Sequence, residues 1–200
     1  MNVTINPVER YIYSIDVNDS NYGSSIKSEL EQESWTEESV SYMPEDGIKR
    51  FYIPKAVGTN SSHLSRYISS RPFKNTLLDL LFSNEDFNTL WSHPIREKFD
   101  QATYIYNRYI LDKSGYYTKA HMDTRHQILF GMIHFINNDD PDQSTYFSTS
   151  RDSNEKIRMS VGPGQGWLCL NNHTAWHEGG NRSNQDRYSM QFGLCFSINI

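Results

Sequence analysis

His121 and Asp123, two side chains of types that bind metal ions, lie two residues apart in the second half of the chain. On a β-strand, residues i and i+2 point to the same face, so both side chains can reach one ion. A further histidine, His177, follows later in the chain. Two imidazoles and one carboxylate on one face of an ion form the ligand set that suits non-haem Fe(II) and leaves coordination positions open. We therefore expect these three residues to form a mononuclear metal site.

A His-x-Asp tripeptide is a weak signal by itself, because it occurs by chance in many proteins. The position of His177 strengthens it, since this histidine lies at the end of a predicted strand and Arg187 begins the next one. If these two strands form an antiparallel pair joined near residues 178–181, His177 and Arg187 face one cavity. His173 is the alternative third ligand, although the Asn-rich segment 171–174 is typical of a turn.

The predicted last strand, residues 186–198, has two different faces. One face is apolar along its length and is expected to pack on helices; it carries Tyr188, Met190, Phe192, Leu194, Phe196 and Ile198. The other face is small and polar, and it suits the lining of a ligand cavity; it carries Arg187, Ser189, Gln191, Gly193, Cys195 and Ser197. A buried arginine is costly unless an anion meets it, so Arg187 is a candidate binding residue.

The rest of the chain divides into a helical part and several short strands. Helices are expected over 61–99, where Ser61 and Pro72 are suited to helix starts, and from about Tyr22 to Glu33. Strands are expected where β-branched and aromatic residues alternate between turn residues, over 8–17, 48–53, 103–111, 127–136, 144–149, 157–161, 166–171, 174–178 and 186–198.

This pattern predicts a mainly β (α+β) fold with a jelly-roll core and N-terminal helices packed on the outside of one sheet. We expect one domain over residues 1–200, in which 1–100 supply strands and supporting helices and 101–200 form the core with the metal site. His126 and His134 are expected to be core histidines or to lie behind the metal ligands, and His63 and His93 to be surface or capping residues.

Composition excludes some classes of protein. The formal net charge is −5 and no run of Lys or Arg occurs, which argues against binding to a nucleic-acid backbone. Only two cysteines are present, and no segment has the pattern of a secretory signal or a membrane span. These features predict a soluble, cytoplasmic protein that does not associate with a membrane.

The pattern His121-x-Asp123…His177…Arg187-x-Ser189 resembles the Fe(II)/2-oxoglutarate-dependent oxygenase superfamily, whose core is a double-stranded β-helix. The resemblance covers roughly residues 101–198. Three further segments are similar to its prolyl-hydroxylase-like branch: Gly115-Tyr116-Tyr117, Phe135-Ile136-Asn137 and Gly164-x-Gly166.

The resemblance implies a role for each matching residue. His121, Asp123 and His177 would bind iron, and Arg187 and Ser189 would hold the distal carboxylate of 2-oxoglutarate. Tyr109, in Asn107-Arg108-Tyr109, would be a further cosubstrate ligand. The chain departs from the family at His134-Phe135, where related hydroxylases often carry a tyrosine. It also carries Gly193 where the superfamily's nucleic-acid demethylases carry a second arginine.

The implied activity is hydroxylation of an unactivated C–H bond by O₂, with decarboxylation of 2-oxoglutarate to succinate. Fe(II), 2-oxoglutarate and O₂ would be required, and ascorbate is a further cofactor to test. The expected substrate is a prolyl or other side chain in a peptide or protein. A free amino acid, another small molecule and a nucleic acid remain alternatives, as does a non-enzymatic jelly-roll binding module. Regiochemistry and oligomeric state stay open.

Overall fold

The computed structural model describes residues 3–9, 11–18, 30, 34–38, 49–53, 63–90, 95–123, 127–134, 141–159, 162–170 and 175–197. Its strands form two sheets, and every strand pairing within the described residues is antiparallel. The larger sheet contains, in spatial order, β1 (Val3–Glu9), β2 (Ile12–Val17), β10 (Gln165–Leu170), β7 (Gln127–His134), β12 (Arg187–Phe196), β5 (Thr103–Asp112), β4 (Arg50–Ile53) and β3 (Thr36–Glu37). The smaller sheet contains β6 (Tyr117–His121), β11 (Trp176–Gly180), β8 (Thr145–Ser148) and β9 (Ile157–Met159).

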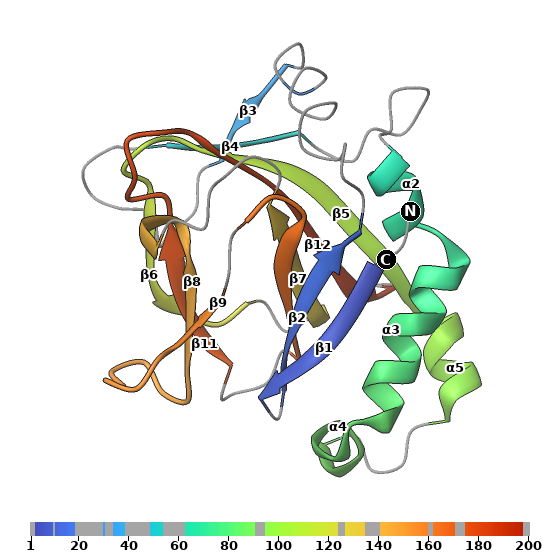
Figure 1. Ribbon diagram of the computed structural model, residues 1–200. Coiled ribbons are helices and arrows are strands. Elements are labelled where there is room, and N and C mark those ends of the chain that lie inside the picture. Colours follow the sequence, from blue (N-terminus) through green and yellow to red (C-terminus); the bar gives the residue numbers. More distant parts are fainter. Residues whose placement is uncertain are drawn as a thin grey trace.

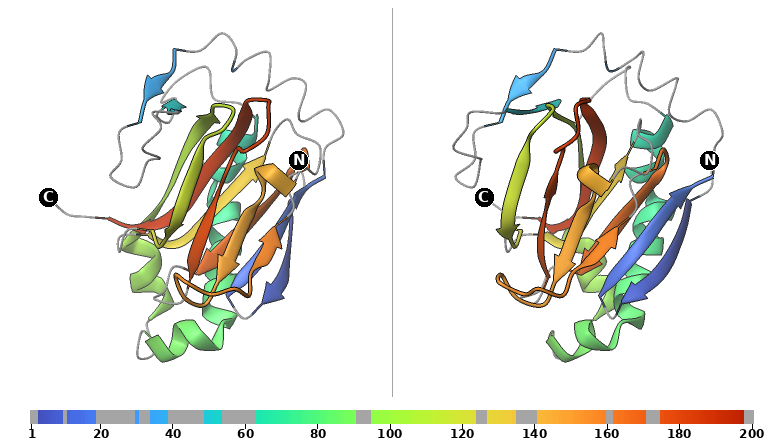
Figure 2. Two further views of the ribbon diagram at one scale, coloured as in Figure 1. Left: turned by 90° about the vertical axis from the view of Figure 1, so that its left-hand side faces the viewer. Right: turned by 60° about the vertical axis from the view of Figure 1, so that its left-hand side comes forward.

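The two sheets face each other, and the helices cover the outer side of the larger one (Figures 1 and 2). This arrangement confirms the predicted mainly β, jelly-roll class with helices outside one sheet. Strands β1, β2 and β4, from the first hundred residues, belong to the same sheet as β5, β7, β10 and β12. The N-terminal part of the chain therefore contributes directly to the sheet that forms one wall of the core.

Four helices occupy the region predicted to be helical: α2 (His63–Ile68), α3 (Arg71–Ser83), α4 (Glu85–Leu90) and α5 (Arg96–Gln101). Ser70 caps α3, because its side chain accepts a hydrogen bond from the backbone N–H of Phe73. Pro72 lies in the first turn, where its missing N–H costs little. No helix in the described part of the chain is both long enough and apolar enough to cross a bilayer.

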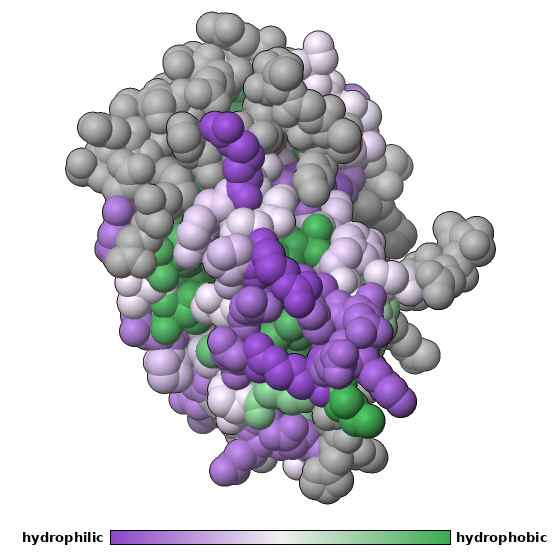
Figure 3. Space-filling model, turned by 90° about the vertical axis from the view of Figure 1, so that its right-hand side faces the viewer, coloured by the Kyte–Doolittle hydropathy of each residue, from purple (hydrophilic) through white to green (hydrophobic). Residues whose placement is uncertain are grey.

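The apolar face of β12 packs on these helices, as predicted. Met190, Phe192 and Leu194 are fully buried in one cluster with apolar side chains of α3, and the Phe73 and Phe192 rings are 5.8 Å apart. Seen from the helical side, the molecular surface is mostly hydrophilic with small hydrophobic areas (Figure 3). The large apolar side chains of this region thus lie between the helices and the sheet.

Two features of the N-terminal part differ from the prediction. The single strand expected over 8–17 is a hairpin of β1 and β2, in which Pro7 pairs with Tyr13. Pro7 is tolerated because β1 is an edge strand. Alternation of side chains predicts extended backbone, but it does not show where the chain turns back on itself. The turn between β1 and β2 was therefore not predicted. The helix expected from Tyr22 to Glu33 lies outside the described residues except for Leu30, which is helical.

Strand β7 agrees with the prediction up to His134; residues 135 and 136 lie outside the described residues. The later strands β8, β9, β10, β11 and β12 fall within a few residues of their predicted positions. A short 3-10 helix, Pro141–Gln143, precedes β8 and was not predicted.

Candidate functional site

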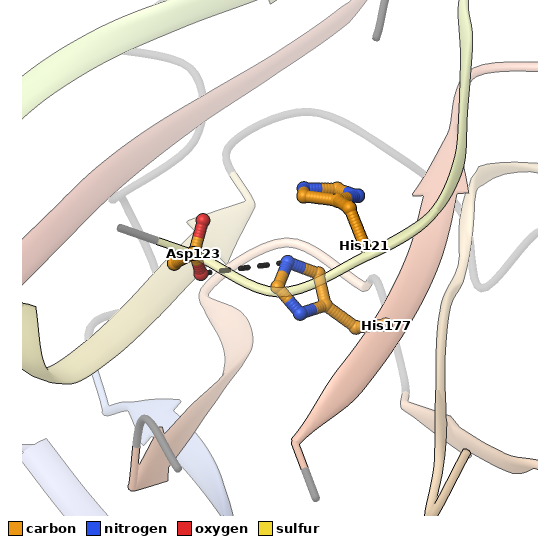
Figure 4. Close-up of side chains that lie close together, drawn as sticks. All are labelled: His121, Asp123 and His177. Atoms are coloured by element: carbon orange, nitrogen blue, oxygen red, sulfur yellow. Dashed lines mark ion pairs between the residues drawn. The ribbon is translucent and has the colours of Figure 1, made fainter. Parts of the chain in front are cut away.

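The three predicted metal ligands converge at one point (Figure 4). His121 is the last residue of β6, and Asp123 follows two residues later. His177 lies in β11 directly opposite His121 in the pairing of the two strands. One ligand atom from each residue lies within 4.8 Å of the others, and His177 Nε2 is 3.5 Å from Asp123 Oδ2. The structure therefore brings together all three residues.

Backbone carbonyl groups orient both imidazoles. His121 Nδ1 is 2.9 Å from the carbonyl oxygen of Lys119, and His177 Nδ1 is 3.3 Å from that of Ala175. When Nδ1 donates its hydrogen to a carbonyl, Nε2 carries the lone pair that can bind a metal. The two contacts thus favour the same tautomer and leave Nε2 of each histidine as the ligand atom.

Burial sets the protonation states of the three residues. Desolvation by burial, with a contribution from the charge of the neighbouring His177, lowers the pKa of His121 to about 4. Burial likewise lowers the pKa of His177 to about 4 and raises the pKa of Asp123 to about 6. At neutral pH both imidazoles are neutral and the carboxylate is mostly ionised, which is the state that binds divalent metals.

Aromatic side chains enclose His177. Its ring lies 5.5 Å from that of Phe147, 5.7 Å from Trp167 and 6.0 Å from Phe130, between ring centroids. All three aromatic side chains are buried. This wall fixes the imidazole and keeps water away from one side of the ligand cluster.

A glycine allows β11 to approach β6 closely. A Cβ atom at Gly180 would lie 2.3 Å from the carbonyl oxygen of Tyr116, the residue that directly precedes β6. Any larger residue at position 180 would push the strands apart. Gly180 pairs with Tyr117 at one end of the two strands, and the register shifts between Gly179 and His177, which pairs with His121.

Arg187 is the first residue of β12 and is 1% exposed. Its guanidinium donates from Nε and Nη2 to Asp112, and from Nη1 to the carbonyl oxygen of Gln143, at 2.7 Å. Asp112 is thus the anion that the burial of Arg187 requires. The predicted strand stops at residue 111, whereas in the structure Asp112 is the fully buried last residue of β5.

A second arginine, Arg50 of β4, also binds Asp112. Its Nε lies 2.5 Å from Asp112 Oδ1, and its Nη2 lies 3.1 Å from Oδ2. Burial by itself would raise the pKa of Asp112, but the adjacent Arg50 and Arg187 guanidinium groups hold this pKa below its usual range. Sequence reasoning missed Arg50, and its only local signal was a second charged side chain, next to Lys49, in the predicted strand over 48–53.

The predicted pairing of the strands that carry His177 and Arg187 is wrong. β11 pairs with β6 and β8 in the smaller sheet, whereas β12 pairs with β5 and β7 in the larger one. The connection between them crosses from one sheet to the other, and Asn181 holds it by donating to the carbonyl oxygens of Asp112 and Gln185. His177 and Arg187 therefore face the same cavity from opposite sheets.

Ser189 and His134 lie directly opposite each other on β12 and β7. Both are fully buried, and Ser189 Oγ and both ring nitrogens of His134 have no hydrogen-bond partner among the described residues. Alternation along β12 places Ser189 on the face that carries Arg187. Buried polar atoms are normally satisfied, so these unpaired atoms next to an arginine fit a polar ligand.

Tyr109 lies elsewhere. It pairs with Met190 in the register of β5 and β12, and it is buried in the apolar cluster on the helical side of the sheet. Asp112 and Tyr109 are three residues apart on one strand, so alternation turns them to opposite faces. The structure does not bring Tyr109 to the cavity that the three candidate metal ligands share with Arg187. Asn107, on the same face as Tyr109, donates to Ser69 Oγ instead.

One cavity of about 30 Å³ joins the two halves of the site. Its lining includes all three candidate metal ligands and both arginines that bind Asp112, together with a polar side chain from the middle of β12: His121, Asp123, His177, Arg50, Arg187 and Gln191. The arrangement places a metal-ligand cluster and a cationic cluster around one cavity. Such a space can bind a metal and an anionic ligand together.

The sequence matches no family model and no curated protein. Solved structures are similar in fold. A prolyl hydroxylase from Trichoplax adhaerens, in complex with a hypoxia-inducible-factor peptide fragment, has a TM-score of 0.62 at 11% identity over 94% of this chain and 84% of its own. The fold of this chain is that of the Fe(II)/2-oxoglutarate oxygenases.

Two further solved structures have a similar fold. A viral collagen prolyl hydroxylase from Paramecium Bursaria Chlorella virus-1, in complex with 2-oxoglutarate, has a TM-score of 0.56 at 10% identity over 94% of this chain and 96% of its own. HygX from Streptomyces hygroscopicus, with nickel and 2-oxoglutarate bound, has a TM-score of 0.53 at 11% identity over 94% of this chain and 83% of its own. At identities this low, the structural similarity shows the fold alone, and the chemistry has to be argued from the residues of this chain.

Proposed function

We propose that this protein is an Fe(II)- and 2-oxoglutarate-dependent dioxygenase, formed by one domain over residues 1–200, that hydroxylates an unactivated C–H bond. The observation that carries the proposal is the sharing of one cavity by the cluster of His121, Asp123 and His177 and by the buried Arg187. Each half by itself would be ambiguous. Together they match the two requirements of this chemistry, a metal with open positions and a cation for the distal end of a dicarboxylate.

The donor set fits the metal. Two neutral imidazoles and one ionised carboxylate, with ligand atoms within 4.8 Å of one another, are suited to a divalent first-row ion. His121, Asp123 and His177 would hold Fe(II). When bound, the iron and 2-oxoglutarate supply O₂ activation and oxidative decarboxylation, which no protein side chain provides.

The residues of the chain bind and orient the cosubstrate. Arg187 is fixed by Asp112 and Gln143, so its guanidinium is already in place before a ligand arrives. Ser189 Oγ, which has no protein partner within the described residues, can donate to the same carboxylate. The cavity of about 30 Å³ takes only water-sized ligands as it stands, so lining side chains have to rotate to admit a five-carbon dicarboxylate.

The aromatic wall around His177 protects the reaction. Phe130, Phe147 and Trp167 are buried against the imidazole and leave little room for water there. A dry site strengthens the charge-assisted hydrogen bonds of the arginines and limits side reactions of reactive species.

A peptide or protein side chain, prolyl in the first instance, is the proposed substrate. Support comes from the fold shared with a prolyl hydroxylase that binds a peptide fragment. The same fold also occurs in HygX, which has been solved with hygromycin B bound, so a small molecule is the second candidate. Succinate release from 2-oxoglutarate, measured against peptides, free amino acids and nucleic acids with and without ascorbate, separates these classes.

One spectrum tests the reaction class. Under anaerobic conditions, we expect the wild-type protein with Fe(II) and 2-oxoglutarate to show a visible charge-transfer band, and Asp123→Ala to lack it. A jelly-roll binding module without this chemistry would retain no Fe(II) and show no band. Absence of the band in the wild-type protein, with Fe(II) and 2-oxoglutarate in excess, would refute the proposed function.

A further inference from the structure

Arg50, Asp112 and Arg187 form a row across three neighbouring strands. In the pairing of β4 with β5, Arg50 lies opposite Asp112, and in the pairing of β5 with β12, Arg187 lies opposite the same Asp112. Directly opposed residues of neighbouring strands point to one face. The carboxylate of Asp112 therefore lies between the two guanidinium groups and accepts hydrogen bonds from both.

The charges within this row do not cancel. Two guanidinium groups and one carboxylate leave one net positive charge, and all three side chains are at least nine-tenths buried, with exposures of 8%, 0% and 1%. Burying a charge without a partner is unfavourable. A row with this charge is suited to receive one further carboxylate.

Asp112 does not engage every donor of Arg50. Its Nε and Nη2 bind Asp112, whereas Nη1 has no acceptor in the part of the chain that the structure describes. The guanidinium also lies over the ring of Tyr116, 4.6 Å from its centroid, which fixes its plane. Arg50 lines the same cavity as the metal-ligand cluster.

We propose that Arg50 is a second anion-binding residue of this cavity and that it donates, together with Arg187, to the distal carboxylate of 2-oxoglutarate. This inference rests on the proposed function. Asp112 is then a positioning residue, because it holds both guanidinium planes without itself contacting the cosubstrate. The N-terminal half of the chain, through β4, supplies part of the cosubstrate site.

Direct binding tests the inference. The probes are 2-oxoglutarate and 2-oxobutyrate, which lacks the distal carboxylate, titrated calorimetrically into the Mn(II)-loaded protein. We expect Arg50→Gln to weaken 2-oxoglutarate binding about tenfold or more, the effect of losing one charge-assisted hydrogen bond, and to leave 2-oxobutyrate binding unchanged. Lys49→Gln is the matched control, because it removes a positive charge from the neighbouring position, where the side chain is 52% exposed and pairs with Glu37. The control should bind both probes as the wild type does.

Arg50→Lys covers the case in which Arg50→Gln does not fold. Lysine keeps the charge but lacks the planar guanidinium that serves Asp112 and a ligand at once, so weaker 2-oxoglutarate binding is expected here too. Wild-type affinity for 2-oxoglutarate in every folded Arg50 variant would overturn the inference and leave the proposed function standing. Failure of the wild-type protein to bind 2-oxoglutarate at all would overturn both.

Discussion

His121 lies directly opposite His177 in the pairing of β6 with β11, and the centroids of their imidazole rings are 4.4 Å apart. Two of the three candidate ligands are therefore held by the main-chain hydrogen bonds of a sheet. Asp123 completes the cluster from just beyond the end of β6. A site built on paired strands is preorganised, so metal binding requires little rearrangement of these ligands.

The first prediction concerns the metal. Mutation of a residue that only hydrogen-bonds to a metal ligand weakens metal binding about 10- to 100-fold. Loss of a ligand itself should have a larger effect, so we expect Asp123→Ala and His177→Ala each to weaken Fe(II) binding by at least about 100-fold. Asp79→Ala is the control, since Asp79 lies on α3 with its side chain 68% exposed. Anaerobic Fe(II) titration provides the measurement. Unchanged Fe(II) affinity in both ligand variants would exclude the metal centre.

The second prediction separates the cosubstrate from the metal. Arg187→Ala should weaken 2-oxoglutarate binding at least about tenfold, because a charge-assisted hydrogen bond contributes about 1.5–3 kcal/mol. Fe(II) affinity should stay near the wild-type value, since Arg187 lies in the larger sheet and the histidine ligands in the smaller one. Fluorescence or calorimetric titration of each ligand measures the two effects independently. A parallel loss of both affinities would indicate structural damage instead of a lost contact.

Much of this site follows from short-range patterns in the sequence, because a strand repeats every two residues. That periodicity separated the polar face of Arg187 from the apolar face of Met190. It also led us to expect Asp123 beside His121, although β6 ends at His121 and Asp123 reaches the cluster from the segment that follows. The same rule places Tyr109 on the helical side, where the structure has it. The family resemblance had assigned Tyr109 to the cosubstrate, which shows that a motif should be checked against strand alternation.

Long-range pairing could not be predicted. Arg50 and Asp112 are 62 positions apart, and their contact exists only because β4 pairs with β5. Sequence patterns likewise do not say which sheet a strand joins, so the strands of His177 and Arg187 were wrongly paired. A buried ion pair between distant strands leaves no local signal beyond a charged residue in an apolar strand.

The third prediction concerns Asp112 and stability. Asp112→Ala should lower the free energy of unfolding by about 3–5 kcal/mol, because it leaves two buried guanidinium groups without their counter-ion. Asp186→Ala should cost only about 0–1 kcal/mol, since Asp186 pairs with Lys113 at the surface, where the lysine side chain is 45% exposed. Urea unfolding of the two variants gives the comparison. Similar losses would show that the Arg50–Asp112–Arg187 row contributes little to stability.

Asp112 also predicts a dependence of stability on pH. The arginines hold its pKa in the folded state below that of an unfolded aspartate, about 3.9, despite burial. A depressed folded-state pKa stabilises the protein above the unfolded value, and this contribution disappears as the pH falls through the folded value. The free energy of unfolding of the wild type should thus fall more steeply below about pH 4 than that of Asp112→Asn. Parallel acid profiles would contradict this.

The fourth prediction uses the unpaired hydroxyl of Ser189. Because Ser189 Oγ has no hydrogen-bond partner among the described residues, Ser189→Ala breaks no contact within them and should leave the free energy of unfolding nearly unchanged. The same change should weaken 2-oxoglutarate binding several-fold, the effect of one hydrogen bond of about 0.5–1.5 kcal/mol.

Ser65 offers the matched buried serine. Its hydroxyl donates to Asn107 Oδ1 and links α2 to β5, at a site on the helical side of the sheet. Ser65→Ala should therefore lower the free energy of unfolding by about 1 kcal/mol without changing cosubstrate affinity. Thermal unfolding measures the stability of both variants, and calorimetry measures their affinity for 2-oxoglutarate. If Ser189 binds the ligand and Ser65 stabilises the fold, Ser189→Ala loses affinity and Ser65→Ala loses stability. Loss of stability in Ser189→Ala with wild-type 2-oxoglutarate affinity would assign Ser189 to the fold instead.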